Sequence, residues 1–280
     1  MVERFLDMEK ARGSIPLSPT MKSKKSTIII LLLFTALVLA GVFYWQTYLR
    51  QKTSTFKYSN ENTTLPQTSE KEIATSTPPF VVKGEISAGN PARRQIIFTF
   101  DAGAGTNSLP KILETAKQHK VQVTFFSTGK FAQKNPDAIK QIAQSGYEIF
   151  NHTYSHPYLT QISDEQIKQE LDQAEQILSG LTGKTTKPFF RPPYGDRNAH
   201  VLEVAKAQGY QSVFWTLDAL DWEASSTADF VKNRIETHLK NGSIILMHVG
   251  DDITGQILNE VFSYIENQGY KIVSLSEGLK

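Results

Sequence analysis

Short apolar runs alternate with longer amphipathic stretches through the last two thirds of this chain. The short runs are rich in β-branched and aromatic residues, which favour extended backbone, so each predicts a strand. They occupy residues 95–100, 121–126, 147–150, 189–190, 211–215, 243–247 and 270–273. Because the stretches between them carry helical signals, the pattern predicts an α/β domain.

Capping residues and glycines mark the helix boundaries. Helix starts are predicted at Ser108, Asn135, Ser163 and Thr227. The clearest is at Ser163, which forms a capping-box pattern with Gln166 ahead of an apolar stripe. Gly146, Gly209 and Gly269 each stand between a helical stretch and a strand, where glycine supplies the left-handed helix stop.

The order of these elements predicts the topology. Strands that alternate with helices imply parallel strands joined by right-handed crossovers. Six or seven such units favour a (β/α) barrel, closed or incomplete, over an open sheet. In such barrels the chemistry gathers at the carboxyl ends of the strands.

A different pattern precedes this domain. Residues 27–45 contain no charged side chain and are apolar on every face. About 20 apolar residues span a bilayer as a helix, and the aromatic residues at 43–45 fit an interfacial belt. The small residue Ala40 also fits a signal-peptide cleavage site. The length of the run favours an uncleaved transmembrane signal-anchor over a cleaved signal and over a buried core helix.

The flanking charges predict the orientation of this anchor. Three lysines lie within residues 21–25, whereas the far flank has only Arg50 and Lys52. This bias places residues 1–26 in the cytoplasm. Residues 46–90 are polar and rich in Thr, Ser, Asn and Gln, which predicts a flexible tether. Residues 91–280 would then fold outside the cell membrane.

Composition excludes several classes of site. The chain of 280 residues has a formal net charge of +2, which gives no reason to expect a nucleic-acid partner. It contains no cysteine, so disulfides, Cys-ligated metal sites and thiol nucleophiles are excluded. The oligomeric state is not indicated.

Residues of catalytic type follow five of the predicted strands. In chain order these residues are Asp101, then His152 and His156, then Arg191, then Asp218, Asp221 and Trp222, and finally His248. Taken singly, each also has a structural explanation as a turn residue, a cap, a solvated charge or a core histidine. Five groups at the same end of a predicted barrel favour an active site.

His152 and His156 are the residues most suggestive of a metal. They lie four residues apart on a loop, directly after a predicted strand. A neutral imidazole is a common ligand for zinc, and this spacing lets two imidazoles meet one ion. Two solvated loop histidines remain the alternative explanation.

The ordered motifs resemble those of the NodB-homology polysaccharide deacetylases, a family of carbohydrate esterases, over about residues 96–280. The motifs that carry the resemblance are Thr99-Phe100-Asp101, His152-Thr153-Tyr154-Ser155-His156, Arg191-Pro192-Pro193-Tyr194-Gly195, Asp218-Ala219-Leu220-Asp221-Trp222 and Leu246-Met247-His248. The resemblance implies a deformed (β/α) barrel and metal-assisted removal of N-acetyl groups from a glycan. By position, His152 and His156 would bind a divalent metal, for which zinc is favoured over cobalt or manganese.

The same resemblance assigns the catalytic roles. Asp101 would be the general base that activates water, and Arg191 would hold it ionised and oriented. His248 would be the acid that protonates the leaving amine, with Asp221 oriented against it.

The resemblance also implies three substrate-binding residues. The backbone N–H of Tyr194 would stabilise the oxyanion, and Trp222 and Leu246 would form the wall of the acetyl pocket. The implied partner is an N-acetylated glycan polymer. A tether close to the membrane favours peptidoglycan, while chitin-like polymers and exopolysaccharides remain open.

The chain departs from the family pattern at Ala102. The family usually has a second aspartate there, which serves as the third metal ligand, and alanine cannot coordinate a metal. Three outcomes follow: a nearby residue such as Asn107 completes the site, the metal is held weakly with extra waters, or the domain has lost catalysis and kept glycan binding. A deacetylase of a small N-acyl compound is a further alternative.

Overall fold

The computed structural model describes residues 83–280. The predicted cytoplasmic segment and signal-anchor, residues 1–26 and 27–45, lie outside the described residues, as does most of the predicted tether. Between residues 83 and 280, no helix has both the length and the apolar character needed to cross a membrane.

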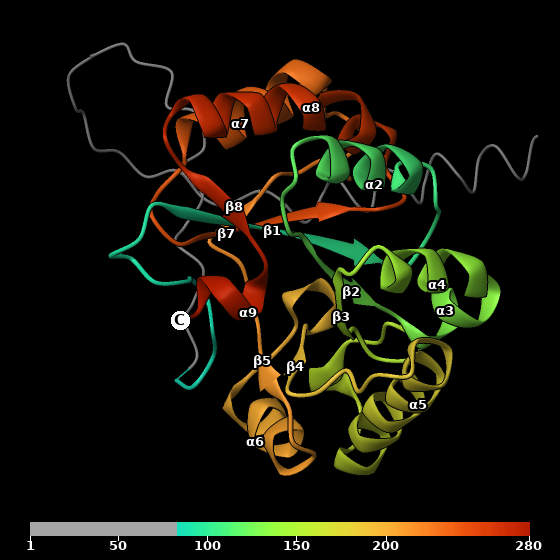
Figure 1. Ribbon diagram of the computed structural model, residues 1–280. Helices are drawn as coiled ribbons and strands as arrows, with labels where there is room; N and C mark the ends of the chain where they lie inside the picture. The colour runs from blue at the N-terminus through green and yellow to red at the C-terminus, as the bar shows by residue number, and fades with distance from the viewer. Residues whose placement is uncertain (1–82) are drawn as a thin grey trace, which may run out of the picture. The chain divides into compact units, whose positions relative to one another are not determined.

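The described chain forms an eight-stranded sheet whose paired strands all run parallel (Figure 1). Its strands are β1 (Gln95–Ala102), β2 (Thr124–Ser127), β3 (Glu148–Asn151), β4 (Phe189–Phe190), β5 (Gln211–Ser212), β6 (Leu217–Asp218), β7 (Ser243–His248) and β8 (Lys271–Val273). Their order is β5-β4-β3-β2-β1-β7-β6, and β8 also pairs with β1. The sheet is a curled half-barrel, so the predicted (β/α) barrel is confirmed in its incomplete version.

Helices lie around the outside of the curled sheet (Figure 1). They are α2 (Leu109–Gln118), α3 (Gly129–Lys134), α4 (Pro136–Gln144), α5 (Asp164–Thr182), α6 (Ala199–Ala207), α7 (Ala228–Thr237) and α8 (Asp252–Asn267). The short α9 (Leu275–Gly278) instead packs with Ile97 of β1. Two single 3₁₀ turns, η1 (Leu159–Gln161) and η2 (Pro193–Gly195), lie in the loops that follow β3 and β4.

The local helix signals are largely confirmed. Ser163 and Gln166 form the reciprocal capping box at the start of α5. Gly146 and Gly209 have φ values of +82° and +85°, in the left-handed region expected for a helix stop. Ser108 stands before α2 but does not cap it, because its hydroxyl bonds instead to the backbone at the start of α8.

Side chains of β1 alternate between two environments. Phe98 and Phe100 face the helices and pack in the main core with residues such as Phe262 of α8. Ile97 belongs to a second cluster on the inner side of the curled sheet. All eight residues of β1 are buried and five of them are apolar, which fits a parallel strand that is covered on both faces. Asp101 is its one charged residue.

The predicted strand at residues 211–215 is shorter in the structure, because β5 ends at Ser212, and the next strand, β6, begins only at Leu217. β5 pairs with β4, whereas β6 pairs with β7 on the opposite edge of the sheet. The chain between β5 and β6 therefore crosses the opening of the half-barrel and cannot stay in one ladder. The run of strand-forming side chains is continuous, but the pairing partner changes, which local sequence does not reveal.

A strap at residues 85–89 occupies this opening. Ile86 pairs with Val213 beside β5, and Gly89 donates a hydrogen bond to the carbonyl of Gly242 just before β7. The Glu85 carboxylate forms a bidentate ion pair with Arg197, with both N–O distances at 2.8 Å. The predicted tether extended to residue 90, but the strap is part of the folded domain.

We expect Glu85→Ala to lower the free energy of unfolding by about 3–5 kcal/mol, because it leaves the Arg197 guanidinium buried without its carboxylate. The side chains of this pair are only 9% and 0% exposed. Urea unfolding followed by tryptophan fluorescence would measure the change. The matched control is Glu114→Ala, which breaks an ion pair with Lys111 that is half exposed and should cost less than about 1 kcal/mol. Equal costs for the two variants would contradict this account of the strap.

Candidate active site

A cavity of about 530 Å³ opens at the carboxyl ends of the strands. Seven of the nine predicted site residues line it: Asp101, His152, His156, Tyr194, Trp222, Leu246 and His248. The other two, Arg191 and Asp221, are buried directly behind lining residues. The remaining walls come from Gly103, Ala104, Pro192, Trp215, Asp218, Gly250 and Asp251.

Strand register explains why residues so far apart in sequence meet here. Asp101 of β1 lies beside His248 of β7 in the parallel ladder. His152 directly follows β3 and Arg191 directly follows β4, and these two strands are also neighbours. Since the strands are parallel, residues just beyond their carboxyl ends share one rim of the sheet.

The two loop histidines converge. The Nε2 atoms of His152 and His156 are 3.1 Å apart. The Nδ1 atom of His152 lies 2.8 Å from the carbonyl oxygen of Arg191, which can only accept, so Nδ1 carries the proton and Nε2 carries the lone pair. Two nitrogens bound to one zinc ion lie roughly 3.3 Å apart, so this geometry fits imidazoles that share a metal.

The electrostatic surroundings keep both imidazoles neutral. Burial lowers the pKa of His152 and outweighs the opposing attraction of Asp101. Burial, assisted by repulsion from His152, lowers the pKa of His156 to about 4. Neutral imidazole is the form that binds metals, so His156 need not lose a proton first once the pH is well above about 4, and the lowered pKa of His152 acts in the same direction.

Glu170 of α5 holds the loop between these histidines. Its carboxylate accepts hydrogen bonds from the backbone N–H groups of Tyr154 and Ser155, at 2.9 and 2.6 Å, and from the Ser155 hydroxyl at 2.6 Å. The loop needs such support because His156 has a φ of +65°, which is costly for a residue other than glycine. Glu170 is not among the residues predicted from the sequence, although an acidic residue beside the apolar stripe of α5 was the available signal.

Glu170→Ala is expected to weaken zinc binding by about 10-fold or more, because the loop loses the three hydrogen bonds that fix its conformation. Competition with a chromophoric zinc chelator would measure the affinity without reference to activity. Glu165→Ala is the matched control, since Glu165 lies on the same helix with a side chain 71% exposed. Wild-type zinc affinity in Glu170→Ala would show that the loop is held by other contacts.

Asp101 is a buried carboxylate paired with a buried guanidinium. Its Oδ1 lies 2.7 Å from Nη1 of Arg191, whose side chain is fully buried. Burial alone would raise the pKa of Asp101, but attraction to Arg191 and to His152 outweighs it, so the pKa is lowered. The second oxygen, Oδ2, lies 3.4 Å from Nε2 of His152. Asp101 therefore presents an ionised oxygen toward the two histidines.

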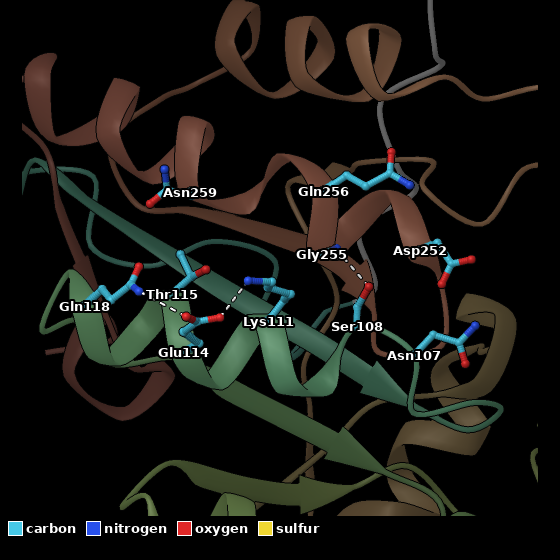
Figure 2. A pocket seen from close by; sticks show the side chains of 10 residues that line it. All are labelled: Asn107, Ser108, Lys111, Glu114, Thr115, Gln118, Asp252, Gly255, Gln256 and Asn259. Carbon is cyan, nitrogen blue, oxygen red and sulfur yellow. Dashed lines mark hydrogen bonds and ion pairs between the residues drawn. The ribbon is translucent and has the colours of Figure 1, made fainter.

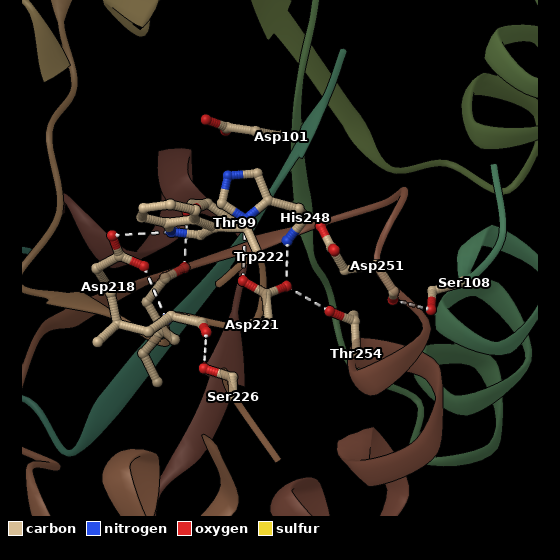
Figure 3. Close-up of polar contacts among 12 residues, drawn as sticks. Thr99, Asp101, Ser108, Asp218, Asp221, Trp222, Ser226, His248, Asp251 and Thr254 are labelled. Atoms are coloured by element: carbon tan, nitrogen blue, oxygen red, sulfur yellow. Dashed lines mark hydrogen bonds and ion pairs between the residues drawn. The ribbon is translucent and has the colours of Figure 1, made fainter. Parts of the chain in front are cut away.

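His248 has the opposite electrostatic character. Burial would lower its pKa, but the hydrogen bond and the charge of Asp221 raise it to about 9. Nδ1 of His248 lies 2.9 Å from Asp221, whose other oxygen accepts from the backbone N–H of His248 and from Thr254. Figure 3 shows the imidazole with Asp221 on one side and Asp101 on the other. At neutral pH this ring is a protonated acid.

Among the described residues, two imidazoles are available for a metal, and the carboxylate beside them, Asp101, is paired with Arg191. Ala102, where the family has a carboxylate, is fully buried in the main core. Asn107 is exposed and lines a separate groove between α2 and α8 rather than the site cavity (Figure 2). The donor set therefore fits a divalent metal held by two histidines, one protein ligand short of an ordinary catalytic zinc site.

A second group of metal-ligand type lies on the opposite wall of the cavity. Ligand atoms of Asp221, His248 and Asp251 all lie within 4.8 Å of one another. The oxygens of Asp221 already accept three hydrogen bonds, two from His248 and one from Thr254. Hydrogen-bond donors thus occupy the positions on Asp221 that a cation would need. Asp221 and His248 therefore form a hydrogen-bonded acid pair rather than a metal centre.

The cavity as a whole holds an ionised carboxylate, a protonated imidazole and two neutral imidazoles. Such a set can bind a metal, remove a proton from water and return one to a leaving group. Groups whose pKa values are shifted apart are the expected arrangement for acid–base hydrolysis.

Comparison with known proteins agrees with this chemistry. The family model described as polysaccharide deacetylase matches residues 88–213. A peptidoglycan-N-acetylglucosamine deacetylase of Bacillus cereus is 36% identical over 187 residues, which cover 65% of this chain and 67% of that protein. The peptidoglycan-N-acetylmuramic acid deacetylase PdaA of Bacillus subtilis is 32% identical over 191 residues, which cover 68% and 73%.

Two solved structures share the fold. The PdaA structure, a family 4 carbohydrate esterase, has a TM-score of 0.66 at 31% identity and covers 70% of this chain and 84% of that one. BA3943 of Bacillus anthracis, described as a pseudoenzyme of the CE4 family, has a TM-score of 0.68 at 28% identity and covers 71% and 70%. These identities over most of each relative, together with the matching family model and half-barrel, show that the chain belongs to the polysaccharide deacetylases, a family of hydrolases.

Proposed function

We propose that this protein is a membrane-anchored hydrolase that removes N-acetyl groups from N-acetylhexosamine units of a polysaccharide outside the cytoplasm. The observation that carries the proposal is the pair of opposite charges in one cavity. The buried carboxylate of Asp101 stays ionised, while the buried imidazole of His248 stays protonated. Hydrolysis of an amide needs a base for water and an acid for the leaving amine, and this pair supplies both.

Each catalytic residue of this chain has one role in the hydrolysis. Asp101 takes a proton from water, and Arg191 keeps its carboxylate ionised and oriented through the 2.7 Å contact. His248 donates a proton to the leaving amine, and Asp221 keeps that imidazole charged and oriented. The backbone N–H of Tyr194 stabilises the oxyanion.

The acetyl methyl group is bound by the apolar wall of the cavity. Trp222 and Leu246 line this wall beside the acid–base pair. Because transfer of a methyl group from water to an apolar surface is favourable, such a wall favours binding of the acetylated amine over the free amine.

His152 and His156 would hold a divalent metal, zinc in preference to cobalt or manganese. A metal there supplies Lewis acidity, which lowers the pKa of water and polarises the acetyl carbonyl. The 3.1 Å separation of the two nitrogens and their neutral state support this assignment.

Peptidoglycan is the polymer we propose as substrate. Two relatives are named as peptidoglycan deacetylases, and the apolar run at residues 27–45 would anchor the domain beside a cell wall. Chitin-like polymers and exopolysaccharides are the competing substrates.

Acetate release by the full chain tests the proposal. The substrates are N-acetylglucosamine oligomers and peptidoglycan, offered after chelation and again with added Zn²⁺, Co²⁺ or Mn²⁺, beside His152→Ala. Metal-dependent release that His152→Ala abolishes is the expected result. No release under any of these conditions would overturn the deacetylase assignment.

A second candidate is a glycan-binding protein that has lost catalysis. Ala102 in place of a metal ligand favours it, and BA3943 is a relative of similar fold described as a pseudoenzyme. Tight glycan binding by a metal-free, inactive protein would support this reading. Equal rates on long oligomers and on a small N-acyl amine would instead indicate a small-molecule deacetylase.

A further inference from the structure

We propose that the stacked side chains of Tyr158 and Tyr194 form a second sugar-binding subsite, which holds a neighbour of the sugar unit that is deacetylated. The inference rests on the proposed function, since it requires the ligand to be a glycan chain. It adds a residue, Tyr158, that lies outside all of the motifs that define the site.

The two tyrosines form an exposed aromatic stack at the mouth of the cavity. Their rings are 4.2 Å apart at their centroids and only 14° from parallel. Tyr158 is 47% exposed and Tyr194 is 58% exposed, which is unusual for large aromatic side chains in this domain. Within residues 83–280 only Trp222 and Phe230 are comparably exposed large hydrophobic residues, and Trp222 lines the same cavity.

The stack is continuous with the catalytic site. Tyr194 lines the cavity, and its ring lies 4.4 Å from the ring of His156, centroid to centroid. Tyr158 does not line the cavity and lies on Tyr194. A ligand on the outer side of this stack is therefore one ring further from the histidines than a ligand inside the cavity.

The loops that carry the stack are fixed to each other. The Asp196 carboxylate accepts hydrogen bonds from the backbone N–H and the hydroxyl of Thr160, both at 2.8 Å. These bonds join the turn after Tyr158 to the turn that contains Tyr194. The stack is thus positioned before any ligand arrives, which reduces the entropy that binding would cost.

A close backbone approach adds to this rigidity. Gly195, next to Tyr194, has a φ of +65°, and a Cβ there would lie 2.8 and 2.9 Å from the rings of Phe214 and Trp215. The turn that presents Tyr194 therefore packs against the aromatic side chains behind it.

The chemistry of the surface matches a sugar ring. A pyranose has a face of C–H groups and a rim of hydroxyls, so it can cover an aromatic face while its hydroxyls stay in water. Half-exposed tyrosines provide an apolar face beside solvent and a phenolic rim for hydrogen bonds. A single N-acetylated sugar in the cavity would not reach Tyr158, whereas a chain would.

Tyr158→Ala tests the subsite in the full-length protein. Binding is measured by calorimetry in an Asp101→Asn background, so that no turnover is needed, with N-acetylglucosamine and its pentamer as the probes. We expect Tyr158→Ala to weaken binding of the pentamer by on the order of 3- to 10-fold and to leave binding of the monomer unchanged. Tyr158→Phe, which keeps the ring, should restore most of the affinity.

Phe230→Ala is the matched control. Phe230 is also 47% exposed but belongs to α7 and does not line the cavity, so its loss should leave pentamer binding unchanged. In the active protein, Tyr158→Ala should raise KM for the pentamer with little change in kcat.

Two results would overturn the subsite. One is that the parent does not bind the pentamer, or that Tyr158→Ala binds it with the same affinity as the parent. The other is an equal loss of affinity for monomer and pentamer, which would mean that Tyr158 only supports the cavity. The two proposals are tested by different measurements. A lack of acetate release would contradict the proposed function, whereas the calorimetry, which needs no turnover, would still test the subsite.

Discussion

Asp221→Asn is expected to lower kcat by on the order of 10²- to 10⁴-fold at neutral pH, because His248 then loses the partner that keeps it protonated. The Asp221 carboxylate contacts both the backbone N–H and Nδ1 of His248, at 2.7 and 2.9 Å. Burial already acts to lower the pKa of this imidazole, and Asp221 is the main influence that raises it. Without that carboxylate the pKa would fall from about 9 toward its ordinary value of 6.5, because burial would then be opposed only by the charges of Asp101 and Asp218.

The pH profile gives this prediction a sign. Since His248 acts as an acid, activity requires its protonated form, so kcat/KM should fall as the pH rises through about 9. In Asp221→Asn the same alkaline limb should move to lower pH. The raised pKa also stabilises the folded state, fully below pH 6.5, and this contribution is lost as the pH rises through about 9.

Asp252→Asn is the control for Asp221→Asn. It removes the same charge from an exposed position that lies outside the site cavity. Its kcat and its alkaline limb should match those of the parent. An unshifted alkaline limb in Asp221→Asn would mean that His248 is not the acid.

Ala102→Asp is expected to tighten zinc binding by at least about 10- to 100-fold. Removing a residue that only orients a metal ligand already weakens metal binding by this factor, and the new carboxylate would be a ligand itself. Position 102 ends β1 next to Asp101, where the family usually carries its third ligand. The same change should lower the stability of the metal-free protein by roughly 1–3 kcal/mol, because Ala102 is fully buried and the new carboxylate would lack a partner. Zinc should therefore raise the Tm of this variant more than that of the parent.

Ala102→Asn distinguishes metal coordination by the new side chain from the effect of its volume. It adds a side chain of nearly the same size without the negative charge, so it should destabilise the protein but not tighten zinc binding. The measurements are zinc affinity by chelator competition, Tm with and without zinc, and acetate release. Unchanged zinc affinity in Ala102→Asp would show that a carboxylate at this position does not reach the histidines. Release by Ala102→Asp alone would identify the parent as a disabled scaffold.

Local signals account for the parts of the fold that the sequence predicted well. The capping box at Ser163 and the glycine stops at Gly146 and Gly209 act within one helical turn, so they can be recognised in the sequence without knowledge of tertiary contacts. The boundaries of β5 and β6 were not predictable in this way. Their strand-forming residues are continuous in sequence, and only the gap in the curled sheet separates them.

The sequence by itself determined the strand–helix alternation, the family and the rim on which the chemistry lies. It could do so because parallel strands bring their carboxyl ends together whatever their detailed packing. It also determined that a metal bound here would have two histidine ligands and would lack the usual aspartate, because residue identity alone fixes which side chains can coordinate.

Only the tertiary structure decided how these residues are held and charged. Glu170 clamps the histidine loop from a helix, Tyr158 stacks on Tyr194, and Glu85 pairs with Arg197 across the opening of the half-barrel. Each of these contacts joins segments 15 to 112 residues apart, so no local pattern encodes it. The opposite pKa shifts of Asp101 and His248 likewise arise from burial and from charges brought near by folding, because a side chain's protonation depends on its surroundings in space.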